Sequence, residues 1–519
     1  MLKSKIKELV NSAIKEAYPK AGDLDFGVES ADPKFGDYST NVAMILAKRA
    51  GEKPEEIANS IVKNIKNDEI FEKVEVAQPG FINFKIAIPY LQQKISEIIE
   101  AGKKYGGTDL GKDLKVNVEF ISANPTGPLT VGNSRGGVIG DALANILGTC
   151  GYKVTREYYF NDAGGQIDVL GHSILKDEQA QYKGDYIDEL AKKITIKDYR
   201  EIGKKAAQIL IGEIKKTAVK MGINFDVWTA EGQDLREKGK IDKIIEWLKK
   251  ENLAYEKDGA WWFKSTQFGD DKDRVIVRSN GEPTYFALDC AYHKDKFVER
   301  KFDRAINVWG ADHYGDLARL KGFVKALGYE DKFDILMHQF VRIIKDGKEV
   351  RMSKRAGNYI LVDDIIDEAG KDVYRFFMLQ YAPNSHLVFD LGLAKEQSEK
   401  NPVYYIQYAY ARISSILAKA GSVPSPNLTL IKEPAEIALI KEVIKLPDLV
   451  IEIAEDYQVQ KLPHYTLELA TKFHNFYEQC RVISEDENLT MARIALIKAT
   501  QIVLKKTLDL MGISAPEKM

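Results

Sequence analysis

Cysteine is scarce in this chain of 519 residues. Its three cysteines, at positions 150, 290 and 480, lie far apart, and no two have the spacing of a zinc-binding pair. The sequence therefore offers neither a disulfide framework nor a zinc pattern, which suits a reducing compartment. We expect no tightly bound metal ion.

Long apolar runs are absent as well. No stretch approaches the ~18 consecutive apolar residues that a membrane span needs. The N-terminal segment is amphipathic and rich in lysine and glutamate, and it lacks the continuous apolar core of a signal peptide. We therefore expect a cytoplasmic protein without a membrane partner.

An excess of positive charge is also missing. The 75 lysines and arginines are balanced by 77 aspartates and glutamates, which gives a net charge of −2. Bulk charge thus gives no support for a nucleic-acid partner, and a surface that binds a polyanion would have to be built by the fold. The length exceeds what one hydrophobic core supports and predicts about three domains.

The pattern of apolar residues changes twice along the chain. Residues 1–105 indicate a small α+β unit, with one strand on each side of a Gln-Pro-Gly turn. Residues 115–390 alternate strands and helices, which is typical of a parallel βαβ sheet, with a charged helical insertion at about 175–270. From Asn401 the pattern predicts a helical bundle. The strands expected in the central region are 116–121, 154–160, 274–277, 305–309 and 334–341.

The segment from Ser122 to Asp141 carries the strongest signal. An apolar run leads into a turn rich in proline and glycine, and a helix-like run follows. This order predicts a helix N-terminus, whose free N–H groups and dipole favour an anion. Thr130 and Asn133 can donate hydrogen bonds there, and Arg135 adds a charge. The alternative is a glycine-rich turn without a ligand.

A second segment, from Lys345 to Asn358, opens with a Lys-Asp-Gly-Lys turn and continues into a basic loop. Such a loop can close over a triphosphate and neutralise the charge that develops in a transition state. A solvated basic hairpin is the alternative. The polar and charged candidates of this loop are Lys348, Arg351, Ser353, Lys354 and Arg355.

Together the two segments resemble the two signature elements of class I aminoacyl-tRNA synthetases. Further segments narrow the resemblance to the arginyl-tRNA synthetases, and it extends over essentially the whole chain. These segments begin with Glu119-Phe-Ile-Ser-Ala-Asn, Arg156-Glu-Tyr-Tyr-Phe-Asn, Thr284-Tyr-Phe-Ala-Leu-Asp, Trp309-Gly-Ala-Asp-His and Asn401-Pro-Val-Tyr-Tyr.

The resemblance implies a multidomain α/β protein. It implies an N-terminal α+β module that contacts tRNA over 1–105, a Rossmann-like parallel-sheet catalytic domain over 106–400, and a helical anticodon-binding domain over 401–519. The implied activity is ATP-dependent ligation of L-arginine to its tRNA through an arginyl-adenylate, with ATP entering as its Mg²⁺ complex. We expect a monomer. Two alternatives remain: another class I synthetase or adenylyltransferase, and a non-catalytic tRNA-binding relative.

The resemblance also implies an arginine-binding set. A guanidinium is a planar five-donor cation and calls for a carboxylate. Tyr285 and Asp289 are four residues apart, so they share one face if the segment is helical, and the resemblance places them at the guanidinium. Glu119 and Asn124 are similar to the family residues that hold the α-amino and carboxylate groups, and His313 completes the pocket.

The catalytic set implied by the resemblance consists of Lys354, Arg351, Ser353, Thr130 and Asn133. Lys354 is the candidate for the charge that stabilises the reacting phosphate. The implied ATP contacts are Gly132, Gly310, Asp312, Lys354 and Arg355.

One feature departs from the family pattern. The usual His-x-Gly-His element is Thr130-Val-Gly-Asn133 here, so both histidines are replaced. Threonine and asparagine still donate hydrogen bonds but carry no charge, and we expect the site to remain active.

The terminal regions supply the candidates for tRNA contact. Single-stranded bases are recognised by stacking and by contacts to their edges. Tyr404, Tyr408, Arg412 and Met519 are the candidates on the anticodon side, although a tyrosine stripe at helical spacing is also typical of a core. Phe81 and Asn83 are the candidates for the corner of the tRNA.

Overall fold

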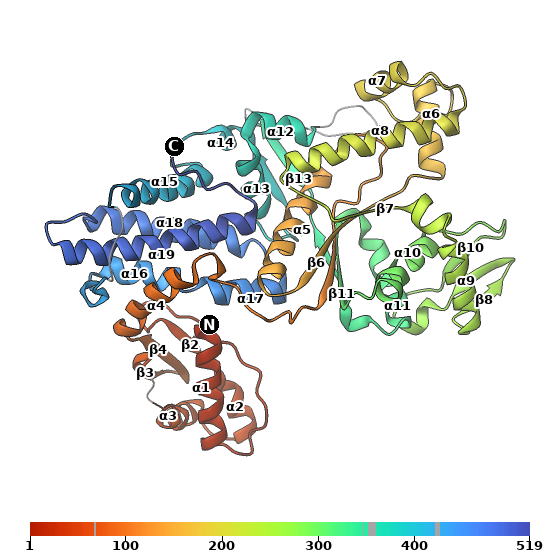
Figure 1. The fold of residues 1–519 in the computed structure, drawn as a ribbon. Coiled ribbons are helices and arrows are strands. Elements are labelled where there is room, and N and C mark those ends of the chain that lie inside the picture. Colours follow the sequence, from red (N-terminus) through yellow and green to blue (C-terminus); the bar gives the residue numbers. More distant parts are fainter. Residues whose placement is uncertain (67–68, 346, 351–359, 421–425) are drawn as a thin grey trace.

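The computed structural model describes residues 1–66, 69–345, 347–350, 360–420 and 426–519. Figure 1 shows an N-terminal module at one end, a central domain with a sheet, and a helical bundle packed beside that domain. The predicted fold class is confirmed. No helix within the described ranges is long and apolar enough to cross a membrane.

The N-terminal module is a four-stranded antiparallel sheet with helices on one face, in the strand order β1-β2-β4-β3. Ile82, Phe84 and Ile86 of β4 are buried against the helices, as the alternation of a strand predicts. The expected pair of strands around the Gln-Pro-Gly turn is confirmed. The elements are α1 (Leu2–Ala17), β1 (Glu29–Ser30), β2 (Tyr38–Thr40), α2 (Val42–Ala50), α3 (Pro54–Asn64), β3 (Phe71–Ala77), β4 (Phe81–Ile86) and α4 (Ile88–Ala101).

The central domain is built on a five-stranded parallel sheet in the order β12-β11-β5-β6-β7. Helix α5 (Val131–Thr149) connects β5 to β6 and is buried along almost its whole length, because the sheet lies on one side and the bundle on the other. Gly140 lets this helix approach the ring of Phe120 more closely than any side chain would permit. The strands are β5 (Lys115–Glu119), β6 (Lys153–Phe160), β7 (Val227–Ala230), β11 (Arg304–Gly310) and β12 (Phe333–His338).

The region expected as a helical insertion also contains strands. The strand β7 supplies one edge of the parallel sheet, and the segment 274–277, expected in that sheet, instead joins a separate antiparallel sheet in the order β10-β9-β8. Short strands between charged helices gave too little periodicity to be recognised. The elements are α6 (Gly165–Leu175), α7 (Asp185–Lys193), α8 (Tyr199–Lys220), α9 (Lys240–Lys250), β8 (Ala254–Lys257), β9 (Ala260–Phe263), β10 (Arg274–Val277) and α10 (Tyr285–Lys294).

A small sheet in the order β14-β13-β15 follows the parallel sheet. The strand expected over 334–341 is in fact two strands, because β12 ends at His338 and β13 begins in the next sheet at Val341. The expected turn at Lys345 is present, since Lys345 pairs with Lys348 across a hairpin. The elements are α11 (Leu317–Ala326), β13 (Val341–Lys345), β14 (Lys348–Val350), α12 (Val362–Ala369), α13 (Lys371–Leu379), β15 (Leu387–Asp390) and α14 (Leu391–Lys395).

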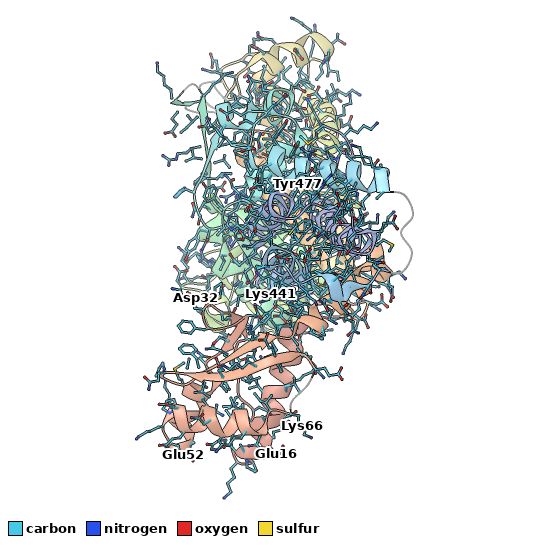
Figure 2. All side chains as sticks on the ribbon, turned by 90° about the vertical axis from the view of Figure 1, so that its left-hand side faces the viewer. Glu16, Asp32, Glu52, Lys66, Lys441 and Tyr477 are labelled. Carbon is cyan, nitrogen blue, oxygen red and sulfur yellow. The ribbon has the colours of Figure 1, made fainter. Side chains whose placement is uncertain are left out.

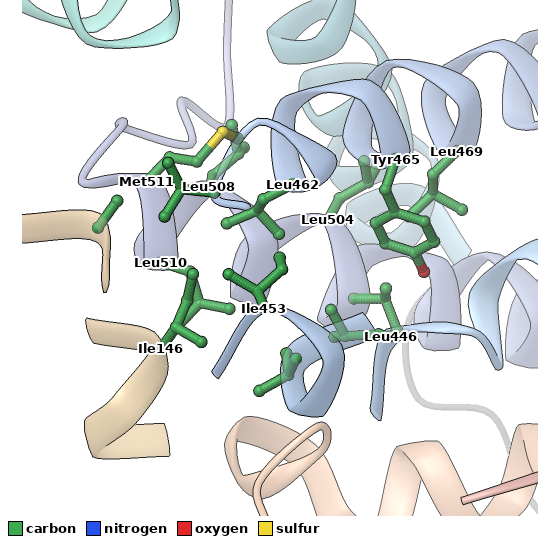
Figure 3. Close-up of a cluster of buried hydrophobic side chains, with 14 of the residues drawn as sticks. Ile146, Leu446, Ile453, Leu462, Tyr465, Leu469, Leu504, Leu508, Leu510 and Met511 are labelled. Carbon is green, nitrogen blue, oxygen red and sulfur yellow. The ribbon is translucent and has the colours of Figure 1, made fainter. Parts of the chain in front are cut away.

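The C-terminal bundle shares one hydrophobic core with the central domain. Figure 3 shows Ile146 of α5 beside Leu510 of the last helix, with Ile453 and Leu462 filling the space between the bundle helices. The helical prediction for this region is confirmed. Its helices are α15 (Pro402–Ala420), α16 (Pro434–Val443), α17 (Leu446–Asp456), α18 (Lys461–Gln479) and α19 (Glu487–Met511).

Arg375 is the polar centre of the same junction. Its buried guanidinium donates to Asp141 Oδ2 of α5 at 2.5 Å, to the Met511 carbonyl of α19 at 2.6 Å and to the Met221 carbonyl after α8 at 3.0 Å. Gly512 packs against it with a φ of 67°, where a Cβ would lie 2.5 Å from the guanidinium. One side chain thus connects three segments by hydrogen bonds.

The N-terminal module docks on the bundle. Lys441 of α16 binds Asp37 of the module at 2.6 Å, and Figure 2 shows Lys441 at the boundary between the two, with Glu16 and Glu52 at the far end of the module. The backbone N–H of Leu2 donates to Asp448 Oδ2 of α17 at 3.0 Å.

Candidate active site

The strand order of the parallel sheet reverses at β5, because the chain runs outward to β7 and then returns to β11 on the other side. In such sheets, ligands bind at the carboxyl ends of the strands beside this reversal. Glu119 ends β5 and Gly310 ends β11. The predicted anion-binding turn follows Glu119 directly, so the crevice holds the candidates of the first segment.

Thr130 and Asn133 bind each other at the start of α5. The Thr130 hydroxyl donates to Asn133 Oδ1 at 2.8 Å. This bond uses the amide oxygen of Asn133, so both N–H groups of that amide keep their donor capacity. Beside them lies a cavity of about 50 Å³, also lined by Tyr182 and Tyr186 of the insertion. The Thr130/Asn133 pair is therefore a preformed hydrogen-bonding unit at a helix N-terminus.

The residues that follow the basic loop in sequence are bonded to this turn. The Val131 N–H donates to the Ile360 carbonyl at 3.3 Å, and the Val362 N–H donates to the Leu129 carbonyl at 3.2 Å. Residues 360–362 are thus attached to the start of α5. The candidates Arg351, Ser353, Lys354 and Arg355 lie outside the described residues.

Arg135 has a different place from the one expected. Its side chain is fully buried, and its guanidinium donates to four backbone carbonyls, of Gln339 (3.0 Å), Tyr381 (3.3 Å), Ala382 (3.0 Å) and Ser385 (2.7 Å). Burial lowers its pKa to about 10. The helical phase of α5 turns this residue away from the crevice, so the expected contribution of its charge to the anion site is wrong.

Tyr285 and Asp289 lie on one face of α10, as their spacing predicts. Tyr285 is 53% exposed. The nearby cation Arg319 stands 4.0 Å from Asp289 and binds Asp316 more closely, at 2.9 Å. Poor solvation raises the pKa of Asp289 to about 7, and neighbouring carboxylates add to the shift against the opposing charge of Arg319.

Glu119 is held by two side chains at the end of β5. Lys296 Nζ donates to Oε2 at 2.6 Å, and the Ser122 hydroxyl donates to Oε1 at 3.0 Å. Lys296 is 0% and Glu119 4% exposed, so this is a buried ion pair. Lys296 also donates to Asn307 Oδ1 at 3.0 Å.

A chain of hydrogen bonds leads from this pair to the α10 backbone. Asn307 Nδ2 lies 3.0 Å from His293 Nε2, and His293 Nδ1 lies 2.8 Å from the Asp289 carbonyl. A carbonyl can only accept, so Nδ1 carries the proton and Nε2 accepts from the amide. Burial and the charge of Lys296 lower the pKa of His293 to about 3, which keeps the ring neutral.

A third carboxylate, Glu231, lies in the π-helix η2 (Glu231–Arg236). It accepts from Arg236 at 2.7 Å and from the Tyr159 hydroxyl at 2.8 Å, and it is 3% exposed. Glu119 and Glu231 thus each have a cation within 2.7 Å, whereas Arg319 stays 4.0 Å from Asp289. Of the three, Asp289 has the least compensated charge and is best suited to receive a ligand cation.

Sequence reasoning missed Lys296, Glu231 and Arg319. Lys296 meets Glu119 only through the tertiary fold, because the two are separated by 177 positions. Glu231 binds Arg236 five positions away and Arg319 binds Asp316 three positions away, but charged residues at such spacings are also typical of a surface.

The candidates after β11 are more open. Asp312 and His313 lie in the 3₁₀ helix η5 (Ala311–Asp316), and the ring of His313 stands 3.7 Å from Asp312 and 3.5 Å from Asp316. Behind them, the buried His338 at the end of β12 lies against Gly310 and against Gly136 of α5. Burial lowers the pKa of His338 to about 4. The sequence analysis did not predict a role for this histidine. Its neutral ring lies between Gly136 and Gly310.

Asn124 is tied to the segment that begins at Arg156. Its Oδ1 accepts the Asn161 N–H at 3.0 Å, and its Nδ2 donates to Gln166 Oε1 at 2.8 Å. The Tyr186 hydroxyl donates to the Thr126 carbonyl at 2.9 Å, so the insertion also contacts this turn. Within the described residues, no cluster of three or more histidine, cysteine, aspartate or glutamate side chains could hold a metal ion.

Comparison with known proteins assigns all three regions. Family models match as an arginyl tRNA synthetase N-terminal domain over 4–86, a class I (R) tRNA synthetase catalytic domain over 94–208 and 189–380, and a DALR anticodon-binding domain over 406–519. A protein from Caldanaerobacter subterraneus subsp. tengcongensis named arginine--tRNA ligase is 44% identical, over 100% of this chain and 99% of its own.

The chain belongs to the arginyl-tRNA synthetase family.

Further relatives agree with this assignment. An arginine--tRNA ligase from Acetivibrio thermocellus is 42% identical over 100% of this chain and 99% of its own. The arginyl-tRNA synthetase structure from Thermus thermophilus, 24% identical, superposes with a TM-score of 0.83 and covers 100% of both chains. The fold of this arginyl-tRNA synthetase family member is thus that of its solved relatives.

The anticodon-binding region of this synthetase presents an aromatic cluster. Arg412 lies over the rings of Tyr408 and Tyr477, at 5.2 and 5.1 Å from their centroids, and His474 stacks on Tyr408 at 5.9 Å. Tyr408 and Tyr477 are each 37% exposed, so the cluster is accessible for stacking. Sequence reasoning did not find His474 and Tyr477 for this surface. Tyr404 is half-buried, and Met519 is 54% exposed.

Phe81 and Asn83 lie on the outward face of the N-terminal sheet. Phe81 is 39% exposed, whereas Asn83 is only 6% exposed between Ser39 of β2 and Glu75 of β3. The structure thus leaves Phe81 open and Asn83 largely covered by neighbouring strands.

Proposed function

We propose that this chain ligates L-arginine to its cognate tRNA through an arginyl-adenylate. The observation that carries the proposal is Asp289, a poorly compensated carboxylate on α10, in the same crevice as Glu119 and the turn that begins α5. A guanidinium would supply the positive charge that Asp289 lacks. Tyr285 would cover the same group, and Glu119 and Asn124 would hold the α-amino and carboxylate groups, with His313 at the open side.

The first step needs no protein base. The arginine carboxylate attacks the α-phosphate of ATP, and the bond to the β-phosphate breaks to release pyrophosphate. Because the nucleophile is already an anion, the chain contributes position and charge stabilisation. Thr130 and Asn133 would donate hydrogen bonds to the phosphates at the helix N-terminus, in place of the usual histidines.

The remaining ATP contacts follow from the crevice. Gly132 lies in the first turn of α5. Gly310 ends β11 and Asp312 follows it, and both would contact the nucleoside part of ATP. Lys354, with Arg351, Ser353 and Arg355, would bring positive charge to the reacting phosphate. ATP would enter as its Mg²⁺ complex, with the ion held by the phosphates.

In the second step, a ribose hydroxyl at the 3′ end of the tRNA attacks the adenylate carbonyl, and AMP leaves. The proposed tRNA contacts are Tyr408, Arg412, Tyr404 and Met519 on the bundle, and Phe81 and Asn83 on the N-terminal module. The exposed Tyr408–Arg412 stack supports the first pair.

The remaining expectations concern the protein in the cell. We propose that it acts as a cytoplasmic monomer with domain boundaries near residues 105 and 400. Sedimentation of the purified chain would test the monomer.

One assay tests the activity: ATP–pyrophosphate exchange with each amino acid in turn, with and without tRNA. Exchange with arginine alone is the expected result. Exchange with another amino acid would indicate a different class I enzyme. No exchange under any condition would indicate a non-catalytic tRNA-binding relative.

A further inference from the structure

Lys296 is a fully buried lysine to which the proposed mechanism gives no role. We propose that Lys296 is a positioning residue of the arginine site, which holds the Glu119 carboxylate in the orientation that receives the α-amino group of the substrate. This inference rests on the proposed function, because it takes arginine as the ligand and Glu119 as the contact of its α-amino group.

Three attachments fix the ammonium group of Lys296. It donates to Glu119 Oε2 at 2.6 Å and to Asn307 Oδ1 at 3.0 Å, and it lies 4.4 Å from the ring centroid of Tyr292. A lysine side chain has many rotamers in water, and complete burial among packed neighbours restricts that freedom here. The ammonium group of Lys296 therefore has a fixed position beside the crevice.

The contacts of Glu119 leave acceptor capacity for a substrate ammonium. A carboxylate offers about four lone-pair sites on its two oxygens. Lys296 takes one site on Oε2 and Ser122 takes one on Oε1, so each oxygen keeps acceptor capacity. Because both oxygens are held, the plane of the carboxylate is set before any substrate binds.

Charge gives a second reason for the lysine. Glu119 is 4% exposed, and a buried carboxylate is costly unless a cation compensates it. Asp289 illustrates the alternative, since burial raises the pKa of this carboxyl and its cation, Arg319, stands 4.0 Å away. Lys296 supplies Glu119 with a permanent partner, so that its orientation does not depend on the substrate.

The same network reaches the other end of the substrate. Lys296 binds Asn307, Asn307 binds His293, and His293 donates to the backbone carbonyl of Asp289. The carboxylate for the α-amino group is thus connected by hydrogen bonds to the backbone of the residue whose carboxylate would bind the guanidinium. Both ends of the proposed site are therefore attached to one network of side chains.

The test compares two ligands on the purified full-length chain by calorimetry. The ligands are L-arginine and 5-guanidinopentanoate, which is arginine without its α-amino group. Lys296→Met is expected to raise the Kd for arginine by about 30-fold or more, as for loss of one partner of a buried ion pair. The Kd for 5-guanidinopentanoate is expected to stay nearly unchanged, because that ligand has no group for Glu119.

A matched control is the buried pair of Arg493 and Glu436 in the bundle, at 2.7 Å. Arg493→Met removes a comparable ion pair away from the crevice and is expected to leave the ratio of the two Kd values unchanged. Equal losses for both ligands in Lys296→Met would overturn the inference, because they would indicate a purely structural role. Failure of the unaltered chain to bind arginine would overturn the proposed function itself.

Ser122→Ala provides a second route if Lys296→Met does not fold. It removes the hydroxyl that donates to Glu119 Oε1 and accepts from the Tyr159 N–H, and it keeps the buried ion pair. We expect a smaller change in the same direction, about fivefold in the ratio of the two Kd values. An unchanged ratio in this folded variant would overturn the inference.

Discussion

Arginine affinity should depend on pH through Asp289. The pKa of this carboxyl is raised to about 7 in the empty site. A bound guanidinium favours the ionised form and lowers that pKa, so arginine binding releases a proton wherever Asp289 starts protonated. At pH 6 about one chain in eleven has the carboxyl ionised, and at pH 8 about ten in eleven. The Kd for arginine should therefore fall about tenfold between pH 6 and pH 8 and level off above.

Calorimetry in buffers of different ionisation enthalpy measures both quantities. We expect release of about 0.9 proton per arginine at pH 6 and about 0.1 at pH 8. Asp289→Asn should bind weakly and without pH dependence. Histidine titrates in the same range, so His313→Asn is the matched control and should keep the full dependence. A Kd that is equal at pH 6 and pH 8 in the unaltered chain would refute the reasoning.

Three further predictions concern stability and catalysis. Arg135→Met leaves four backbone carbonyls without their buried donor and should lower the free energy of unfolding by about 3–5 kcal/mol in urea titrations; a loss below about 1 kcal/mol would contradict this. Gly512→Ala places a Cβ against Arg375 at positive φ and should cost about 1–3 kcal/mol by the same measurement, whereas Gly148→Ala, which meets open space, should not destabilise. Lys354→Ala should reduce adenylate formation in pyrophosphate exchange and leave tRNA affinity nearly unchanged; loss of tRNA binding would place that loop elsewhere.

Local periodicity predicted the parts of the fold that depend on neighbours in sequence. The strand, turn and helix around Thr130 are present, and so are the helix that puts Tyr285 and Asp289 on one face and the helices of the bundle. Short elements were lost: β7 has four residues and lies between charged helices, so no repeat identified it. The register of the parallel sheet could not be predicted either, because it is set by pairing between segments that are distant in the sequence.

The candidate site divides in the same way. Motif residues such as Glu119 and Asp289 could be named from the sequence, because each lies in a recognisable segment. The partners that determine their charge could not, because Lys296, Arg319 and Glu231 reach the crevice from separate elements. Arg135 shows the converse, since a residue inside the motif is turned into the interior by the phase of its helix.

The guanidinium of Arg375 has a consequence for engineering chimeric enzymes. It binds a side chain of α5 and the final carbonyl of α19, and Gly512 fits against it. In a C-terminal domain grafted from a relative, the last helix would have to end at the same position, so that its final carbonyl still accepts from Arg375. Exchange of that domain alone would disturb the helix whose first residues are the proposed ATP contacts. Successful grafts should therefore take Asp141, Arg375 and Gly512 from the same parent protein.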